Sequence, residues 1–363
     1  MPSLDDLLAK MVEVHGSDLH LKVGSPPMIR IDGNLQPIDL PPVAPADTEA
    51  WAQSVMPPRA VASFRDLHEA DFAYGKAQLG RFRVNVYRQR TSVSIVIRAV
   101  QPASKSFGEL GLPPIMSRLA QAPRGLLLVT GPTGSGKTTT MAAMVDAINS
   151  TRRVNIITIE DPIEVLHPDK MALVSQRELG VDTVSFDQAL RRVLRQDPDV
   201  ILIGEIRDKD TAEAAIQAAD TGHLVLSSLH TLDATETINR LLDFFPPFQH
   251  QGIRLMLAGT LQGIVSQRLI PKADGIGRVP ATEVLTSNPR VFDRIVDSEK
   301  THTLRDLIED GEFYGMHSFD QALMGLYQKG VITYDDALSH ASNASDFKVK
   351  LQQKIRPPEQ QAS

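Results

Sequence analysis

One stretch of eight residues has the composition and spacing of a loop that holds a polyphosphate, G-x-x-x-x-G-K-[ST]. Glycines let a backbone wrap closely around phosphates, whose charge then faces amide groups and a helix N-terminus. Lys137 would reach the β- and γ-phosphates, and the Thr138 hydroxyl would ligate Mg²⁺. The pattern predicts binding of a nucleoside triphosphate, and the alternative is a glycine-rich turn that binds nothing. With the first residue of the following helix, the predicted binding residues are Gly131, Pro132, Thr133, Gly134, Ser135, Gly136, Lys137, Thr138 and Thr139.

The segments on either side of this loop have the pattern of a strand and a helix. Residues 126–129 are a short apolar run suited to a buried strand, and 139–148 has apolar residues at helical spacing. From about 113 to 285 strands and helices alternate, which predicts a parallel sheet flanked by helices and an α/β fold. Ligands of such sheets bind outside the carboxyl ends of the strands.

A second segment ends a predicted strand with three carboxylates, those of Glu160, Asp161 and Glu164. Carboxylates at the end of a buried strand are costly unless they face water or a metal. One of them could orient or deprotonate an attacking water. The alternative is that Asp161 and Pro162 form a turn and Glu164 is simply solvated.

A third segment places Glu205 just after the apolar run 200–203. Glu205 would hold Mg²⁺ through water or polarise the nucleophile. The aspartate that usually precedes this glutamate is replaced by Gly204, so metal coordination would depend more on Thr138 and water. Arg207 is equally well explained as a partner for nearby carboxylates and as a catalytic group.

Two histidines, His223 and His230, lie on either side of a further predicted strand. Their separation of seven residues sends them to opposite faces of the sheet, so a shared metal is not expected. A single histidine is more often a structural hydrogen-bonding group than a catalyst. His230 follows the carboxyl end of the strand and is the better candidate to contact a γ-phosphate.

The composition fits a globular protein without a secretory or membrane-spanning segment. Of 363 residues, 42% are hydrophobic and 23% charged, and the net charge of −6 with 5% aromatic residues argues against a nucleic-acid surface. The absence of cysteine excludes disulfides and thiolate metal sites. The first ten residues lack the apolar core of a signal peptide, and no apolar run could span a bilayer. We therefore expect a cytoplasmic protein.

The remainder of the chain predicts two further regions. Residues 1–100 contain a Ser3-capped helix, strands at 18–23, 28–31 and 35–40 with a turn at Asp32 and Gly33, a helix at 47–55, and strands at 81–88 and 92–99. This pattern indicates a small α+β domain. We place a linker at 101–112, the nucleotide-binding core at 113–288, a helical region at 289–352 and a disordered tail at 353–363.

These motifs, in this order, resemble the secretion-superfamily ATPases, and the N-terminal motifs narrow the resemblance to the PilT/PilU family of type IV pilus retraction motors. The similarity extends over nearly the whole chain. The N-terminal motifs are Gly16-Ser17-Asp18-Leu19-His20-Leu21, Pro26-Pro27-Met28-Ile29-Arg30-Ile31-Asp32-Gly33 and Gly80-Arg81-Phe82-Arg83-Val84-Asn85.

The resemblance implies a PAS-like N-terminal domain, a RecA-like P-loop ATPase domain and a homohexamer that hydrolyses ATP with Mg²⁺. It also implies movements that depolymerise a pilus through an inner-membrane platform protein, beside the cytoplasmic face of the membrane. By position, Lys137 and Thr138 would bind phosphate and metal, Glu164 and Glu205 would be the two glutamates of the site, and His223 and His230 would form the histidine box. Arginines of the N-terminal domain, some of which reach the nucleotide, match Arg81, Arg83 and Arg98. Without the resemblance, these three arginines could equally form a solvated strand face.

One segment departs from the family pattern. Retraction ATPases often carry Ala-Ile-Arg-Asn-Leu-Ile-Arg-Glu, whereas residues 289–298 here are Pro-Arg-Val-Phe-Asp-Arg-Ile-Val-Asp-Ser. The later segments 316–323 and 332–338 look closer to the PilU side. Hydrolysis is still expected, and retraction could depend on this chain alone or on a paralogous retraction ATPase beside it.

Three alternative functions fit the sequence less well. An assembly or type II secretion ATPase usually carries an added N-terminal domain and a tetracysteine insertion, neither of which is expected here. A RecA-like motor on nucleic acid would need a basic, aromatic-bearing groove, which the composition does not support. A scaffold that binds but does not hydrolyse nucleotide is disfavoured by the presence of Lys137, Glu164 and Glu205 together.

Overall fold

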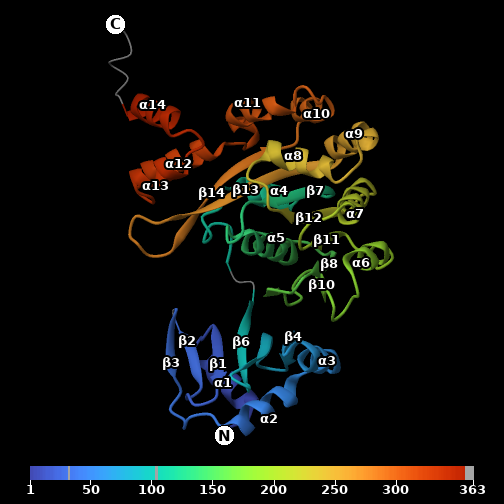
Figure 1. Cartoon of the computed structure of the whole chain (residues 1–363). Helices are drawn as coiled ribbons and strands as arrows, with labels where there is room; N and C mark the ends of the chain where they lie inside the picture. Colours follow the sequence, from blue (N-terminus) through green and yellow to red (C-terminus); the bar gives the residue numbers. More distant parts are fainter. Residues whose placement is uncertain (32, 103–104, 356–363) are drawn as a thin grey trace. The chain divides into compact units, whose positions relative to one another are not determined.

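The computed structural model describes residues 1–31, 33–102 and 105–355, and the chain divides into two compact units (Figure 1). The first unit is Met1–Pro102 together with Glu164–Leu166, and the second is Ala103–Ile163 with His167–Ser363. Sequence reasoning gave no indication that three residues, flanked on both sides by segments of the second unit, would join the first unit. They do so because β9 (Val165–Leu166) pairs in parallel with the end of β6 (Ser92–Pro102).

The first unit is an antiparallel sheet with helices packed against it, in strand order β3-β2-β1-β6-β5-β4. Its helices and its other strands are α1 (Leu4–Glu13), α2 (Pro45–Val55), α3 (Pro58–Leu67), β1 (Asp18–Lys22), β2 (Met28–Ile31), β3 (Asn34–Pro37), β4 (Glu69–Lys76) and β5 (Gly80–Gln89). The predicted capping of α1 is confirmed, since the Asp6 amide donates to Ser3 Oγ at 3.2 Å and the Ser3 amide donates to Asp6 Oδ2 at 3.0 Å.

The core of the first unit follows the alternation seen in the sequence. Phe82, Val84 and Val86 of β5 are all buried and pack with the apolar stripe of α1. Of the predicted turn after β2, Asp32 lies outside the described residues, and Gly33 has φ of 83°. Sequence reasoning missed α3 and β4; of α3 only Ala60 is fully buried, and Phe64 packs partly buried against the core.

The second unit is built on a seven-stranded sheet in the order β10-β8-β11-β12-β7-β13-β14. All neighbouring strands are parallel except the pair β13 and β14. The strands are β7 (Gly125–Thr130), β8 (Asn155–Glu160), β10 (Leu173–Glu178), β11 (Val200–Ile203), β12 (Leu224–Leu229), β13 (Leu261–Pro271) and β14 (Arg278–Thr286). This sheet confirms the predicted α/β class.

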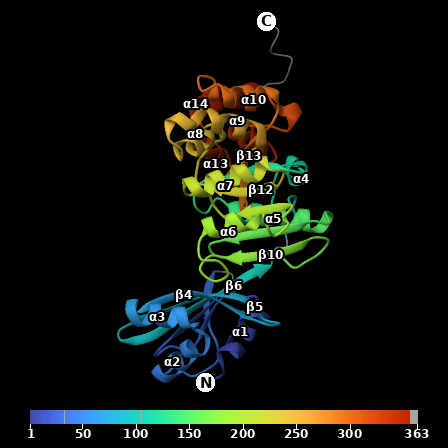
Figure 2. The ribbon, with the colours of Figure 1, turned by 90° about the vertical axis from the view of Figure 1, so that its right-hand side faces the viewer.

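Helices cover both faces of this sheet, because successive strand residues point to opposite sides. Leu126 and Leu128 pack against the helices α6 to α11, whereas Leu127 and Val129 pack against α4 and α5. Figure 1 shows α6 and α7 on one side of the strands and α4 and α5 on the other, and Figure 2 looks onto the side that carries α6 and α7. The bounds are α4 (Ile115–Ala120), α5 (Lys137–Thr151), α6 (Phe186–Val193), α7 (Lys209–Asp220), α8 (Ala234–Asp243), η1 (Pro247–Gln249) and α9 (His250–Thr260).

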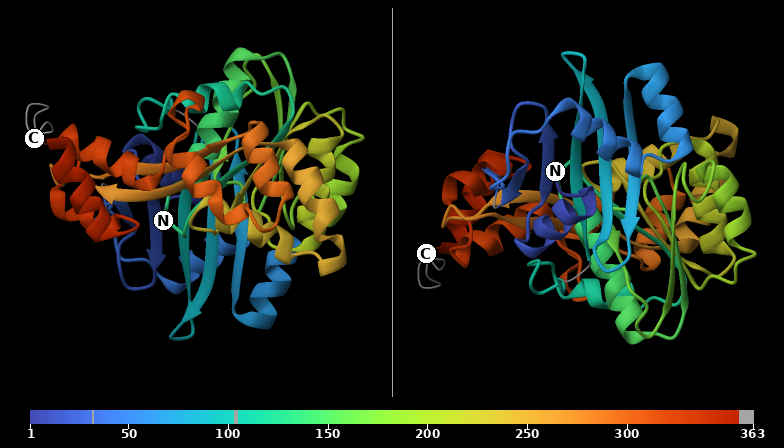
Figure 3. Two further views of the ribbon diagram at one scale, coloured as in Figure 1. Left: turned by 90° about the horizontal axis from the view of Figure 1, so that it is seen from above. Right: turned by 90° about the horizontal axis from the view of Figure 1, so that it is seen from below.

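The C-terminal region is helical, as predicted. In Figure 3 the last helices lie at the far end of the β13–β14 hairpin, where Phe319, Leu323 and Phe347 form a separate apolar cluster with Ile270. The altered segment 289–298 still forms a helix, α10, whose Val291 and Ile295 are buried. The elements are α10 (Pro289–Val296), η2 (Thr301–Thr303), α11 (Leu304–Glu309), η3 (Glu312–Tyr314), α12 (Phe319–Gln328), α13 (Tyr334–His340) and α14 (Ala344–Ile355).

Two predicted boundaries shift at their edges. β6 continues to Pro102, so the first two residues of the expected linker 101–112 belong to β6, where they pair with β9. α14 ends at Ile355, inside the range 353–363 expected as a tail, and residues 356–363 lie outside the described part of the chain. Among the described residues, no helix has the length and apolar character needed to cross a bilayer.

A buried carboxylate, that of Glu283 on β14, should make the stability of the second unit depend on pH. Glu283 is only 7% exposed and accepts a hydrogen bond from the Ala234 amide at 3.0 Å. Burial raises the pKa of its carboxyl to about 7, and Asp233 adds to this effect. The folded unit therefore holds this proton more tightly than the unfolded chain, and the resulting stability is lost as the pH rises from about 4.5 through about 7.

We expect Glu283→Gln to raise the thermal midpoint of this unit at pH 8, because the substitution should increase the free energy of unfolding at that pH by on the order of 3 kcal/mol at most. A glutamine oxygen can still accept from the Ala234 amide. The gap between variant and wild type should close near pH 5. Thermal unfolding at both pH values, with Glu213→Gln on α7 as the matched control, measures this. A gap that is the same at both pH values would contradict the prediction.

Candidate nucleotide site

The loop between β7 and α5 has the backbone conformation that a phosphate-binding loop requires. Gly131, Gly134 and Gly136 have φ values of 140°, 78° and 92°. Residues with a β-carbon rarely adopt these values, so the three glycines of the motif are needed for the path of the chain. α5 begins at Lys137, directly after Gly136, which leaves the free amides of its first turn at the end of the loop.

The wall behind this loop is the neighbouring strand β13. A β-carbon on Gly131 would lie 2.3 Å from the backbone oxygen of Gln267, and one on Gly136 would lie 2.7 Å from Gln267 Nε2. Gln267 Nε2 donates to the Ser135 oxygen at 2.7 Å, and Thr140 Oγ1 donates to Gln267 Oε1 at 2.8 Å. Sequence reasoning missed Gln267. The sequence of β13 gave no signal that singles it out, since Gln262, Ser266 and Arg268 are polar residues of the same strand.

Lys137 keeps its ammonium group at the loop. Its Nζ donates to the carbonyl oxygens of Gly131 at 2.7 Å and Pro132 at 3.2 Å. Burial lowers the pKa of Lys137, and the negative charge of Glu205 opposes that shift. The lysine and the glutamate predicted from separate motifs are therefore electrostatic neighbours.

Glu205 follows β11, and hydrogen bonds from β12 hold its backbone. Ser228 Oγ donates to the Gly204 oxygen at 2.7 Å, and the Ile206 amide donates to the Ser228 oxygen at 3.0 Å. Both carboxylate oxygens of Glu205 have cationic or imidazole partners, since Arg207 Nε lies 2.9 Å from Oε2 and His230 Nε2 lies 3.0 Å from Oε1. The carboxylate is thus fixed in one orientation.

The order of the strands explains why these groups meet. β11, β12 and β7 are consecutive parallel strands, and Glu205, His230 and the phosphate loop follow their carboxyl ends. His223 precedes β12, where its backbone oxygen accepts from the Gly125 amide at the start of β7. The six-residue length of β7 separates His223 from the loop by roughly 20 Å.

The partners of His223 are local. Its Nδ1 lies 2.9 Å from the Ala218 oxygen and 3.2 Å from Thr221 Oγ1. These are the contacts of a structural histidine, and a role for His223 in nucleotide binding stays a prediction.

The three carboxylates of the acidic segment have separate surroundings. Glu160 Oε1 accepts from Thr158 Oγ1 at 2.6 Å and from Gln176 Nε2 at 3.1 Å. Asp161 Oδ2 lies 3.9 Å from Arg207 Nη1, so Arg207 contacts two carboxylates, as one of its two readings expected. Glu164 belongs to the first unit.

The predicted arginines lie on the first unit. Arg83 Nη1 is 3.3 Å from Glu164 Oε1, and Arg98 Nε is 2.8 Å from Asp18 Oδ1. Arg81 stands on β5 opposite Val100 of β6. Arg98 therefore has a structural partner within its own unit, and contact of any of these arginines with a nucleotide stays a prediction.

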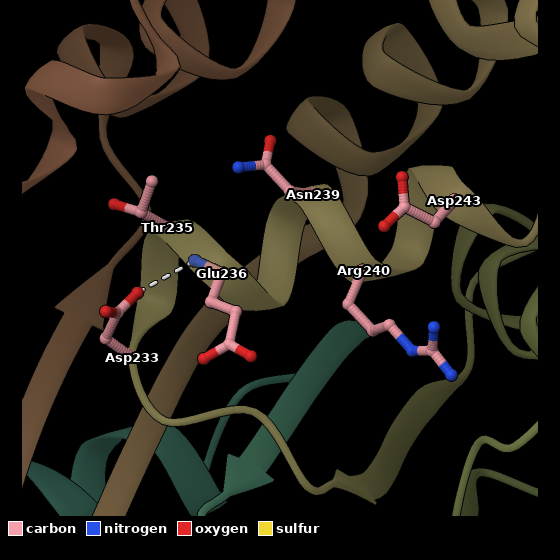
Figure 4. A pocket seen from close by; sticks show the side chains of 6 residues that line it. All are labelled: Asp233, Thr235, Glu236, Asn239, Arg240 and Asp243. Atoms are coloured by element: carbon pink, nitrogen blue, oxygen red, sulfur yellow. Dashed lines mark hydrogen bonds between the residues drawn. The ribbon is translucent and has the colours of Figure 1, made fainter.

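A surface pocket of about 490 Å³ lies along α8 and is lined only by residues of that helix and its N-cap (Figure 4). The Asp233 carboxylate caps the helix by accepting from the Glu236 amide at 2.8 Å. None of the lining residues comes from the phosphate loop or from the Glu205 cluster. The six are Asp233, Thr235, Glu236, Asn239, Arg240 and Asp243.

The fold and the phosphate loop define the class of the second unit, a P-loop nucleotide-binding α/β unit. The sequence profile described as "Type II/IV secretion system protein" matches residues 4–311. The type IV pilus retraction ATPase PilT of Pseudomonas aeruginosa is 42% identical, over 95% of this chain and 99% of that protein. The type IV pilus ATPase PilU of the same organism is 41% identical, over 96% and 91%.

A crystal structure of the pilus retraction motor PilT with bound ADP is similar in fold, with a TM-score of 0.87 and 42% identity, and the match covers 96% of this chain and 100% of that one. The chain belongs to the type II/IV secretion ATPase family, within its PilT/PilU group. It is an ATPase of that family, and the resemblance inferred from its motifs is confirmed.

Proposed function

We propose that this chain is a homohexameric motor that hydrolyses Mg²⁺-ATP to power type IV pilus retraction, and with it twitching motility. The observation that carries the proposal is the similarity to a retraction ATPase over nearly the full length of both chains. The cluster of Lys137, Glu205 and His230 beside the phosphate loop supports the proposed ATP hydrolysis, because it brings together an ammonium group, a carboxylate and an imidazole.

The donor groups suit ATP with a magnesium ion. Mg²⁺ in phosphoryl-transfer sites is usually held by one or two protein oxygens together with phosphates and water. The Thr138 hydroxyl and, through water, the Glu205 carboxylate would supply those oxygens, and the metal would neutralise charge on the phosphates. Lys137 would bind the β- and γ-phosphates. Glu205, oriented by Arg207 and His230, would position the attacking water, and His230 would contact the γ-phosphate.

Glu164 and the arginines Arg81, Arg83 and Arg98 belong to the proposal through the family pattern. Glu164 would act as the catalytic glutamate of the acidic segment. An arginine supplied across a subunit boundary would neutralise charge that develops on the γ-phosphate. The ion pair between Arg83 and Glu164 would then have to rearrange during turnover.

The proposed partners are further copies of this chain, an inner-membrane pilus platform protein and a paralogous retraction ATPase. The motor would act at the cytoplasmic face of the inner membrane as a peripheral protein. The alternatives are an assembly or type II secretion ATPase and a PilU-like accessory motor. Identities of 42% to PilT and 41% to PilU do not separate the main from the accessory role. The altered segment 289–298 favours the accessory role.

Surface pilus count and twitching in a strain that lacks this gene test the proposal. Many pili without movement are expected for a main retraction motor, because pili would still assemble but could not be withdrawn. Abundant pili with weakened but persistent movement would assign the accessory role. A strain without any pili would overturn retraction and favour assembly.

A further inference from the structure

Gln267 is a buried polar residue of β13, the next-to-last strand of the sheet, and both polar atoms of its side chain are directed at the phosphate loop and the helix after it. Gln267 is only 3% exposed. Along the strand it lies between Val265 and Ile270, which, like Ile264, are fully buried apolar residues. A buried amide is costly unless it is hydrogen-bonded. Here both ends of the amide are bonded, to the Ser135 oxygen and to Thr140 Oγ1.

The contacts of Gln267 extend over the whole loop. Its backbone oxygen lies 2.3 Å from the position that a β-carbon of Gly131 would take, and its Nε2 lies 2.7 Å from the corresponding position at Gly136. Its side chain also bonds to Ser135 in the loop and to Thr140 in the first turn of α5. One residue of β13 thus contacts the beginning, the end and the following helix of the phosphate-binding segment.

The bond to Ser135 sets the direction of an amide that would bind phosphate. The Ser135 carbonyl and the Gly136 N–H belong to one planar trans peptide unit and point in opposite directions. Because Gln267 Nε2 holds the carbonyl toward β13, the Gly136 N–H must point away from β13. The bond to Thr140 fixes the rotation of the first turn of α5 against the same strand.

We propose that Gln267 is the positioning residue of the phosphate site, which keeps the amides of residues 136–138 directed at a bound di- or triphosphate. This proposal rests on nucleotide binding at the loop. It assigns Gln267 an effect on nucleotide affinity and no contact with the nucleotide.

Ser266 provides a matched control. It is the preceding residue of β13, is fully buried, and its Oγ accepts a hydrogen bond from Thr130 Oγ1 at 2.9 Å. This bond reaches the end of β7 and stops short of residues 131–138. Ser266→Ala therefore removes one buried hydrogen bond beside the loop and leaves the contacts between Gln267 and the loop in place.

The test measures the dissociation constant for a fluorescent ADP analogue, together with amide hydrogen exchange in residues 133–138 of the nucleotide-free protein. We expect Gln267→Met to weaken ADP binding about tenfold or more and to speed exchange in this segment, because it removes two buried hydrogen bonds. Ser266→Ala should change affinity by less than about threefold. Equal ADP affinity and equal exchange in the two variants would overturn the proposal.

Gln267→Glu tests the same proposal through pH, without a change of shape. A protonated glutamic acid can donate to the Ser135 oxygen and accept from Thr140, as glutamine does, whereas a carboxylate can only accept. Burial should raise the pKa of this new carboxyl. ADP affinity should be within about threefold of wild type near pH 5.5 and about tenfold weaker at pH 8.5. A ratio to wild type that does not change with pH would contradict the positioning role.

The two proposals fail in different ways. Failure of the wild-type protein to bind the ADP analogue would overturn nucleotide binding at this loop, and the role of Gln267 with it. Tight binding by wild type and by Gln267→Met alike would leave nucleotide binding standing and overturn only the role of Gln267.

Discussion

Glu205→Gln is expected to abolish ATP turnover, with a loss in kcat of about 10²- to 10⁴-fold, while ATP binding stays largely intact. Glutamine keeps the shape of the side chain but carries no charge and is a poor proton acceptor. In the wild type both oxygens of Glu205 are held, by Arg207 Nε at 2.9 Å and His230 Nε2 at 3.0 Å. The carboxylate is therefore fixed for work on a water or a metal-bound water, and its charge is the part that glutamine removes.

The measurement pairs steady-state phosphate release with the dissociation constant for ATP. Glu213→Gln on α7 is the control, because it makes the same chemical change in the same unit at a glutamate whose partner is Gln217 of its own helix, at 3.3 Å. Undiminished hydrolysis in Glu205→Gln would exclude the role assigned to Glu205. Loss of ATP binding together with turnover would instead show that Glu205 mainly balances the charge of Lys137, its electrostatic neighbour.

The parts of the site that sequence reasoning located are those fixed by local pattern and strand order. A strand, a glycine-rich loop and a helix in direct succession leave little freedom, and the observed φ values of Gly131, Gly134 and Gly136 follow from that motif. The meeting of Glu205 and His230 follows from a general rule, since residues after the carboxyl ends of parallel strands gather at one edge.

The parts that sequence reasoning could not locate depend on contacts between distant residues. Gln267 and Ser135 are 132 positions apart, and no spacing rule connects them. The short strand β9 joins the first unit by pairing with β6, and Glu164, directly before it in the chain, forms an ion pair with Arg83 of that unit. Such pairings are set by tertiary packing, which a periodic pattern in one segment does not encode.

The two histidines differ in their position along β12. Both were singled out because they lie next to one strand, yet His230 follows its carboxyl end and contacts Glu205, while His223 precedes its amino end and contacts Ala218 and Thr221. Position along the strand therefore favours His230, as the sequence indicated, and a role for either histidine in nucleotide chemistry stays a prediction.

Gly131→Ala is expected to be the most damaging single change in the phosphate loop, both to stability and to nucleotide binding. At φ of 140° a β-carbon is strained, and here it would also lie 2.3 Å from the backbone oxygen of Gln267. Because Gln267 is paired with Thr282 in the β13–β14 ladder, the loop must move instead. Strain and clash together should lower the free energy of unfolding by about 3 kcal/mol or more.

Gly134→Ala is the matched control, since Gly134 has φ of 78° but its β-carbon would meet no atom within 4 Å. It should cost only about 1–2 kcal/mol, the strain of a left-handed alanine. Thermal midpoints of the nucleotide-free variants compare the two costs, and titration with ADP shows whether Gly131→Ala has lost its phosphate site. Equal midpoints would mean that β13 can yield to the loop, and would contradict the rigid wall from which the position of the phosphate-binding amides is argued.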